Sequence, residues 1–143
     1  TFYSNASFIH SSVNLGDFVG SGGDRPLQGQ SPYIINTGIF YNTPKKDLTA
    51  TISYNYVGPR IYIVGNVQEP SVWENGRNVL DFQVSKKIGE KIELKLNFKD
   101  VIAQDLIYFQ DLNNNHRYDK AVDNTWQEIN FGQTISASFK YTF

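Results

Sequence analysis

Hydrophobic and polar residues alternate strictly along the last eleven residues of the chain, Gln133–Phe143. One face of a strand built from this segment carries Ile135, Ala137, Phe139, Tyr141 and Phe143. Alternation with a period of two predicts a strand with one apolar and one polar face. Three aromatic residues in the final five positions are unusual for a soluble domain, because chain ends usually fray. They suit a strand that meets lipid, where aromatic side chains gather at the membrane interface.

Five further segments show a similar alternation, so the sequence predicts six strands in all. These segments are Thr1–Val13, Tyr33–Tyr41, Leu48–Val57, Asn78–Ile88 and Ile92–Phe98. The alternation is weak in the first of them and clearest in the third. The pattern allows the third strand to continue through Arg60–Val64, with a bulge at Gly58-Pro59. No segment has a convincing helical period, although Val101–Phe109 is ambiguous and allows a helical turn.

The alternation also predicts which side chains share a face of the sheet. On the apolar face we expect Ile35, Ile39, Ile52, Tyr54, Leu80, Phe82, Val84, Leu94, Leu96, Phe139 and Tyr141. On the polar face we expect Asn36, Ser53, Asn55, Asp81, Gln83, Lys95, Ser136 and Ser138. A register slip of one residue would exchange the two faces. In a membrane barrel the apolar face contacts lipid and the polar face lines the lumen. In a soluble β-sandwich the apolar face covers a core and the polar face meets solvent.

The connections between the predicted strands alternate in length. Asn42–Asp47 is a tight turn, and Gly89-Glu90 is a two-residue hairpin signal. Three long polar segments alternate with these turns along the chain, and we expect them to lack regular structure. They are Asn14–Gln30, Gly65–Arg77 and Gln110–Gly132. Short periplasmic turns that alternate with long extracellular loops are typical of outer-membrane barrels. The predicted fold class is therefore an all-β, antiparallel transmembrane β-barrel fragment of about six strands.

Six strands are too few for a closed transmembrane barrel, since single-chain barrels begin at about eight. We therefore expect the first and last strands to pair with strands outside residues 1–143. Position 1 is Thr instead of Met, which leads us to expect a fragment or a processed product. The whole segment 1–143 is then one C-terminal part of a barrel.

Composition narrows the class of protein. The net charge is -1 and the sequence pI is about 6.0, so the basic surface that a nucleic-acid partner requires is missing. The chain has no cysteine, which excludes disulfides and thiolate metal sites. Its mean hydropathy is -0.40 although 15% of its residues are aromatic. No apolar run is long enough for a transmembrane helix, whereas half-apolar barrel strands with polar loops have such an average.

Several segments together resemble the closing strands of TonB-dependent receptors of Bacteroidota-type bacteria. The segments that carry the resemblance are Arg25–Tyr33 (RPLQGQSPY), Tyr56–Ile61 (YVGPRI), Arg77–Lys86 (RNVLDFQVSK), Leu94–Gln104 and the terminal Phe143. The resemblance extends over nearly the whole chain, while residues 1–19 contribute little to it.

The resemblance implies a barrel of about 22 strands that is filled by an N-terminal plug domain. Such a receptor imports a scarce ligand across the bacterial outer membrane and draws energy from TonB, which contacts the plug. On this basis the chain holds only the last six strands, and its partners are outer-membrane lipid, the remaining strands, the plug and, through the plug, TonB. Phe139, Tyr141 and Phe143 are also similar to the C-terminal signal that the barrel-assembly machinery recognises.

One candidate metal site is present in the last long segment. Asp111, Asn113, Asn115 and Asp119 supply oxygen atoms at the intervals of a calcium-binding loop. The segment departs from the full pattern, because His116 replaces the turn glycine and Val122 stands where a bidentate glutamate belongs. Two interpretations stay open, a weak calcium site and a polar loop that is rich in turn-forming residues.

No catalytic constellation is evident in the chain, and we do not expect an enzyme. The only histidines, His10 and His116, are far apart in sequence, and no nucleophile elbow, metalloprotease or phosphate-loop spacing occurs. Trp73 and Trp126 fall in long connections, where we expect them to anchor at the level of lipid headgroups or to stack on a ligand. The alternative function is a soluble or surface β-sandwich that binds a partner through its long loops.

Overall fold

A computed structural model describes residues 1–14, 24–66 and 68–143 as two antiparallel sheets. The larger sheet has the order β1-β2-β3-β6-β7-β10. Its strands are β1 (Phe2–Phe8), β2 (Tyr33–Thr43), β3 (Leu48–Val57), β6 (Arg77–Ile88), β7 (Ile92–Lys99) and β10 (Thr134–Tyr141). The smaller sheet has the order β4-β5-β8-β9. Its strands are β4 (Arg60–Ile63), β5 (Val72–Glu74), β8 (Leu106–Gln110) and β9 (Asn124–Ile129).

The all-β, antiparallel prediction is confirmed, and the six predicted strands are the six strands of the larger sheet. Their bounds differ from the prediction by at most two residues at either end, and those of β3 match it, except that β1 ends at Phe8 instead of Val13. The weak alternation of that segment agrees with its early end. The only helical element in the described residues is a 3-10 turn, η1 (Pro44–Lys46), which connects β2 to β3. No helix in this part of the chain is long and apolar enough to cross a bilayer.

The register of the larger sheet sorts its side chains into two faces. Residues that are directly opposite each other in an antiparallel pair project from the same face. One row of such partners crosses all six strands and consists of Phe2, Ile39, Ile52, Phe82, Phe98 and Ile135. A row on the opposite face contains Thr51, Gln83, Asn97 and Ser136. The predicted grouping of residues into an apolar and a polar set is therefore confirmed.

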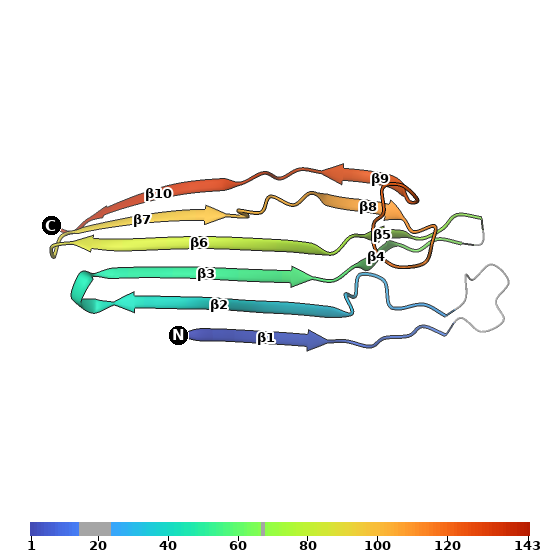
Figure 1. Ribbon diagram of the computed structural model, residues 1–143, viewed down its shortest axis with the longest axis horizontal. Coiled ribbons are helices and arrows are strands. Elements are labelled where there is room, and N and C mark those ends of the chain that lie inside the picture. The colour runs from blue at the N-terminus through green and yellow to red at the C-terminus, as the bar shows by residue number, and fades with distance from the viewer. Residues whose placement is uncertain (15–23, 67) are drawn as a thin grey trace.

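Short and long connections lie at opposite ends of the larger sheet (Figure 1). The η1 turn, the turn between β6 and β7 and the C-terminus share one end. Ile88 pairs with Ile92, so the second of these turns consists of Gly89, Glu90 and Lys91 instead of the predicted two residues. Gly89 has a φ of 63°, a left-handed conformation that glycine adopts without steric cost.

The prediction that the long connections lack regular structure is wrong for two of them. Gly65–Arg77 contains β5, Gln110–Gly132 contains β9, and the ambiguous segment Val101–Phe109 leads into β8 instead of a helical turn. The predicted continuation after Gly58-Pro59 forms β4, but this strand belongs to the smaller sheet. These short strands depend on partners that are distant in sequence, as in the pairing of Trp73 with Phe109, and not on a local pattern.

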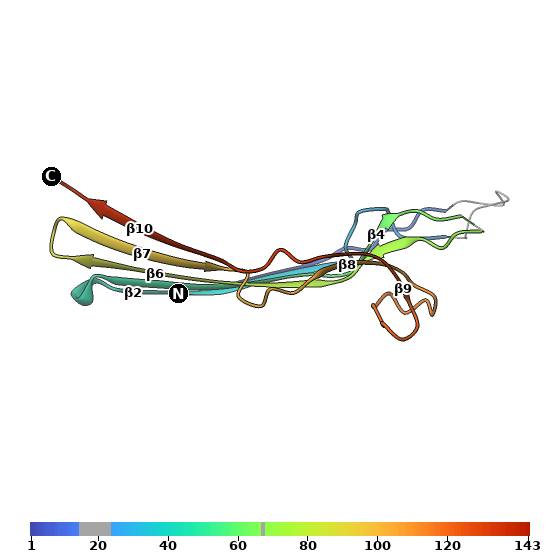
Figure 2. The ribbon, with the colours of Figure 1, turned by 90° about the horizontal axis from the view of Figure 1, so that it is seen from above.

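The larger sheet is open and forms a single twisted layer (Figure 2). Its two edges are β1 and β10, which do not pair with each other. Residues 15–23 of the predicted long segment Asn14–Gln30 lie outside the described part of the chain. The buried hydrophobic residues among those described are Ile61, Val72 and Phe109, and all three belong to the smaller sheet.

Candidate functional site

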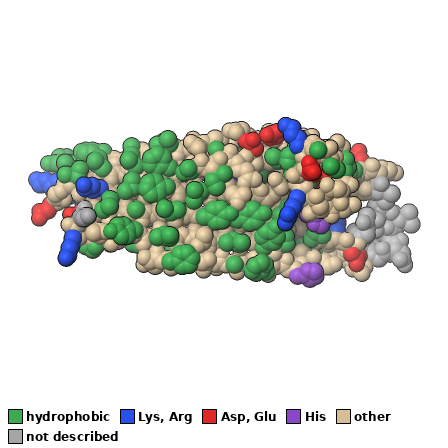
Figure 3. Space-filling model, viewed as in Figure 1, with side chains coloured by type: hydrophobic (Ala, Val, Ile, Leu, Met, Phe, Trp, Pro, Cys, Tyr) green, Lys and Arg blue, Asp and Glu red, His purple; other side chains and the backbone are tan. Residues whose placement is uncertain are grey.

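The apolar face of the larger sheet is uncovered. No hydrophobic side chain in the six strands of this sheet is buried, and Ile52 in the middle of the sheet is 44% exposed. The view in Figure 3 shows hydrophobic side chains gathered over this part of the molecule. Soluble monomers rarely expose a contiguous apolar patch of this extent, and such a patch usually marks an interaction surface. The face is therefore the first candidate for a functional surface.

The polar face carries hydrogen bonds between side chains of neighbouring strands. Asn55 Nδ2 donates to Asn36 Oδ1, which links β3 to β2. Ser85 Oγ donates to Glu93 Oε1 at 2.8 Å, and Asn97 Nδ2 donates to Ser136 Oγ at 3.1 Å. Cross-strand pairs of this kind stabilise a sheet and fix its register.

A glycine on the polar face provides space for an aromatic ring. Gly38 lies directly opposite Tyr3 in the β1–β2 pair. A Cβ at position 38 would lie 2.3 Å from the Tyr3 hydroxyl oxygen and 2.8 Å from the Ile52 carbonyl oxygen. Only glycine fits there without a shift of the strand, so the edge strand β1 depends on this residue for its contact with β2.

Aromatic rings contact one another in the larger sheet and in the smaller one. At the end with the short turns, the rings of Tyr141 and Phe143 meet edge to face with centroids 5.1 Å apart. Two of the predicted assembly-signal residues lie on the apolar face, where Phe139 is opposite Leu94 and Tyr141 is opposite Ile92. In the smaller sheet, the rings of Tyr62, Tyr108 and Trp126 contact one another at centroid distances of 4.3–6.3 Å.

An ion pair lies next to this second aromatic cluster. Arg60 donates to both carboxylate oxygens of Glu74 at 2.9 Å, across the β4–β5 pair. Burial, followed by the negative charge of Glu74, raises the pKa of Tyr108 above its ordinary value, whereas Arg60 lowers it. The two members of the ion pair thus act on the pKa of Tyr108 in opposite directions, in addition to the larger effect of burial.

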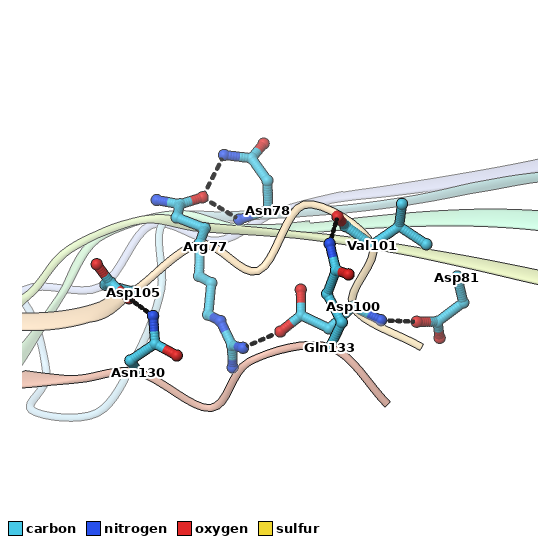
Figure 4. A network of polar contacts seen from close by, with 9 residues as sticks. Arg77, Asn78, Asp81, Asp100, Val101, Asp105, Asn130 and Gln133 are labelled. Carbon is cyan, nitrogen blue, oxygen red and sulfur yellow. Dashed lines mark hydrogen bonds and ion pairs between the residues drawn. The ribbon is translucent and has the colours of Figure 1, made fainter. Parts of the chain in front are cut away.

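A polar network joins the two sheets at their junction (Figure 4). Arg77 forms an ion pair with Asp100, and the guanidinium lies 5.1 Å from the centroid of the Phe131 ring. The backbone N–H of Asp100 donates to Asp81 Oδ1 at 2.9 Å. Asp100 has a φ of 53°, which is the left-handed backbone conformation that residues other than glycine rarely adopt. The network holds the first residues after β7 against β6.

Two further contacts extend the network to the segment before β10. Gln133 Nε2 donates to the Val101 carbonyl oxygen at 2.6 Å, and Asn130 Nδ2 donates to Asp105 Oδ1 at 2.6 Å. These contacts fix the path of the chain as it returns from the smaller sheet to the larger one.

The four predicted calcium ligands lie in one loop, where backbone amides already occupy several of their oxygen atoms. Asp111 Oδ1 accepts from the Asn115 N–H and Oδ2 from the His116 N–H, at 3.2 and 2.7 Å. Asn113 Oδ1 accepts from Asn115, and Asp119 Oδ1 accepts from the Ala121 N–H. In the described part of the chain, no three carboxylate or imidazole groups gather as a metal-ion cluster. The calcium site stays a prediction.

Asp123 is a structural residue of this loop that the sequence reasoning missed. It is buried, and its two oxygens accept from the Leu112 N–H at 3.0 Å and from the Asp119 N–H at 2.7 Å. It therefore closes the loop by joining its beginning to its end. The separation of four positions between Asp119 and Asp123 is a sequence signal that could have indicated that Asp123 closes the loop.

The two histidines, which are far apart in sequence, line the same pocket. This pocket has a volume of about 250 Å³ and lies where the continuation of β1, the 24–32 segment, β5 and the 111–123 loop meet. The rings of His116 and Trp73 stack in it with centroids 4.1 Å apart. Trp73 stacks as a wall residue of this pocket, while Trp126 belongs to the aromatic cluster.

Comparisons with protein families, with curated proteins and with solved structures gave no match to this chain.

Proposed function

We propose that the chain forms the last six strands of a TonB-dependent importer in a bacterial outer membrane. The observation that carries the proposal is the uncovered apolar row that crosses every strand of the larger sheet, with a hydrogen-bonded polar face behind it. In the proposed arrangement the apolar face contacts lipid and the polar face is directed to the plug and the lumen.

Strand length supports this proposal for the three central strands, while β1, β7 and β10 contain 7, 8 and 8 residues. The strands β2, β3 and β6 contain 11, 10 and 12 residues. A tilted strand needs about 9–11 residues to cross the hydrocarbon layer. The short turns at one end and the long connections at the other also agree with the periplasmic and extracellular sides of an outer-membrane barrel.

The open edges of the sheet determine the partners in this proposal. Unpaired backbone groups cost several kcal/mol each in hydrocarbon, so β1 and β10 require neighbouring strands from the rest of the same barrel. The plug, TonB through the plug, and the barrel-assembly machinery are the remaining proposed partners. The proposal predicts that the gene encodes a plug and further strands upstream of Thr1.

The test uses spin labels at two adjacent positions of β3 in the full-length protein, in outer-membrane preparations. A label at Ile52 should be accessible to oxygen and protected from a water-soluble nickel chelate, because oxygen concentrates in lipid. A label at Ser53 projects from the opposite face and should show lower oxygen accessibility. Equal accessibility at both positions, or a nickel-accessible label at Ile52, would contradict the lipid-facing assignment and favour a soluble binding module.

A further inference from the structure

The apolar face of the larger sheet consists of rows of directly opposed residues that cross the strands. The central row contains Ile39, Ile52, Phe82, Phe98 and Ile135. The next row on the same face lies two residues further along each strand. A row follows the direction of the backbone hydrogen bonds between strands. The rows in which the hydrophobic side chains end therefore show how a partner that covers this face is oriented relative to the strands.

Toward the junction with the smaller sheet, the hydrophobic side chains of this face end in a different row in different strands. They end in the central row in β7 and β10, with Phe98 and Ile135. They extend one row further in β6, to Leu80, two rows further in β3, to Tyr56, and three rows further in β2, to Tyr33. Two positions beyond each of these residues, the chain has a polar residue or glycine. This boundary of the apolar region therefore runs obliquely across the rows.

Polar atoms gather at this boundary. The Tyr54 hydroxyl donates to Asn78 Oδ1 at 2.5 Å, and Asn78 lies one row nearer the junction. Asn78 Nδ2 in turn donates to Gln104 Oε1 at 2.8 Å. The rings of Tyr33 and Tyr56 stack with centroids 5.7 Å apart. Aromatic rings with a polar tip are typical of the level at which a protein surface passes from hydrocarbon to lipid headgroups.

Toward the short turns, the boundary is also displaced from strand to strand (Figure 1). Tyr41 in β2 lies one row beyond the central row, Lys86 in β6 lies two rows beyond it, and Tyr141 in β10 lies three rows beyond it. Lys86 is the only charged side chain on the apolar face of the six described strands, and its row neighbours are Leu48 and Leu94. A lysine among leucines extends its ammonium group to the headgroups while its carbon chain stays in the apolar layer.

The two boundaries slope in the same direction by similar amounts. Four steps from strand to strand separate β2 from β10, and over them the boundary shifts by two rows at the short turns and by three rows at the junction. That is about 1–1.5 residues per strand, or roughly 3–5 Å along strands that lie about 4.8 Å apart. The slope corresponds to a tilt of about 35–45°, which is the tilt of strands in transmembrane barrels.

The separation of the two boundaries agrees with the thickness of a bilayer. In β2 they are marked by Tyr33 and Tyr41, and in β6 by the polar side chains of Asn78 and Lys86, so that each strand has nine residues between and including its markers. In β10 the hydrophobic positions from Ile135 to Tyr141 are two residues shorter. A tilted strand crosses the hydrocarbon layer with about 9–11 residues.

We propose that the two surfaces of the bilayer cross this face obliquely, so that the strands are tilted by about 35–45° from the membrane normal. Tyr41, Lys86 and Tyr141 lie at the headgroups of one leaflet, and Tyr33 and Tyr56 lie at those of the other. The inference rests on the proposed function, because it requires that the apolar face contacts lipid. It adds the depth of each strand and its orientation in the bilayer.

The test measures the depth of single spin labels on β2 and β10 of the full-length protein, in vesicles of phosphatidylethanolamine and phosphatidylglycerol. The ratio of collision rates with oxygen and with a water-soluble nickel chelate reports the depth. Tyr41 and Ala137 belong to one row, and Tyr141 lies two rows nearer the short turns. We expect equal depths for the labels at Tyr41 and Tyr141, and a label at Ala137 about 10 Å deeper than both.

A second pair of positions keeps the test decisive if a tyrosine variant does not insert. Ile39 and Phe139 are displaced by the same two rows, so their labels should also have equal depths. Ser136 is the control, because it precedes Ala137 and projects from the polar face. A label at Ser136 should have low oxygen accessibility.

The outcomes separate the inference from the proposed function. Equal depths at Tyr41 and Ala137, with Tyr141 nearer the surface, would overturn the tilt and leave the lipid contact intact. A label at Phe139 that is more than about 10 Å shallower than one at Ile39 would do the same. Oxygen accessibility at Ala137 as low as at Ser136 would contradict the lipid contact itself and would overturn both.

Discussion

The ion pair of Arg77 and Asp100 should determine the local stability of the junction between the two sheets. The perturbation is Asp100→Asn, which removes the charge, keeps the shape of the side chain and retains a residue type that tolerates a φ of 53°. Arg77 is then left without its carboxylate partner, while its Nε is already buried without a hydrogen bond.

The exposure of the two side chains sets the magnitude. Breaking a buried pair costs about 3–5 kcal/mol, whereas an exposed pair contributes about 0–1 kcal/mol. The Arg77 and Asp100 side chains are 23% and 13% exposed, which is closer to the buried limit. The asparagine oxygen retains part of the hydrogen bond, so we expect a loss of about 2 kcal/mol. That corresponds to roughly a 30-fold increase in local opening.

Hydrogen exchange measures this local opening. The Val101 N–H donates to the Leu80 carbonyl oxygen at 2.8 Å, directly beside the ion pair, and its protection factor should fall by roughly 30-fold in Asp100→Asn. The matched control is Asp47→Asn. Asp47 also has a positive φ, of 49°, but is exposed and forms no ion pair with any described side chain.

A double-mutant cycle with Arg77→Gln separates the pair from other effects. If the ion pair carries the stability, the double variant should lose less protection than the sum of the two single variants. Additive losses, or a change below about threefold in Asp100→Asn, would refute the reasoning.

Three further predictions concern other parts of the molecule. Gly38→Ala should weaken the β1–β2 pair by about 1–3 kcal/mol, because the new Cβ would clash with the Tyr3 hydroxyl and with a backbone oxygen. The rate of hydrogen exchange in β1 should rise in this variant, and Ser53→Ala is the control. Glu74→Gln should lower the raised pKa of Tyr108, since it removes a negative charge and frees Arg60; a difference titration at 295 nm against Tyr108→Phe measures this. The folded state favours the neutral phenol, so the contribution of Tyr108 to stability is present below its ordinary pKa of about 10 and is lost as the pH rises through the raised value. Phe143 is fully exposed at the end of the sheet, so its deletion should change the stability of the described fold little. If the proposed assembly signal is correct, the deletion should reduce the amount of the protein in outer-membrane fractions, and equal amounts would refute the signal.

The larger sheet could be predicted from the sequence because the pattern that defines each of its strands lies within the strand itself. Each strand except β1 alternates apolar and polar positions over eight or more residues, and register follows from keeping the apolar positions on one face. Ile52 and Ser53 illustrate this, since their neighbours in β3 alone place them on opposite faces.

The smaller sheet and the pocket could not be predicted in the same way. β5 contains only three residues, too few for a period, and it pairs with β8 across a long stretch of chain. Gly58-Pro59 indicated an interruption of the strand, since proline cannot donate a hydrogen bond to a ladder. It did not indicate that the next strand belongs to a second sheet. His10 and His116 line one pocket because segments that are distant in sequence fold against each other there.

The three buried hydrophobic residues of the smaller sheet have a consequence for how the chain can vary. Ile61 and Phe109 come from different connections and both pair with Trp73, whereas Val72 projects from the other face of the same sheet. The two connections therefore hold each other in place through the smaller sheet. The 24–32 segment joins them, since the Gly29 N–H donates to the Ile61 carbonyl oxygen at 2.8 Å. These connections should open and close as one cooperative unit. An insertion in one of these segments would destabilise the other two. A change in what this end of the molecule recognises would therefore require coordinated substitutions in both connections and in the 24–32 segment.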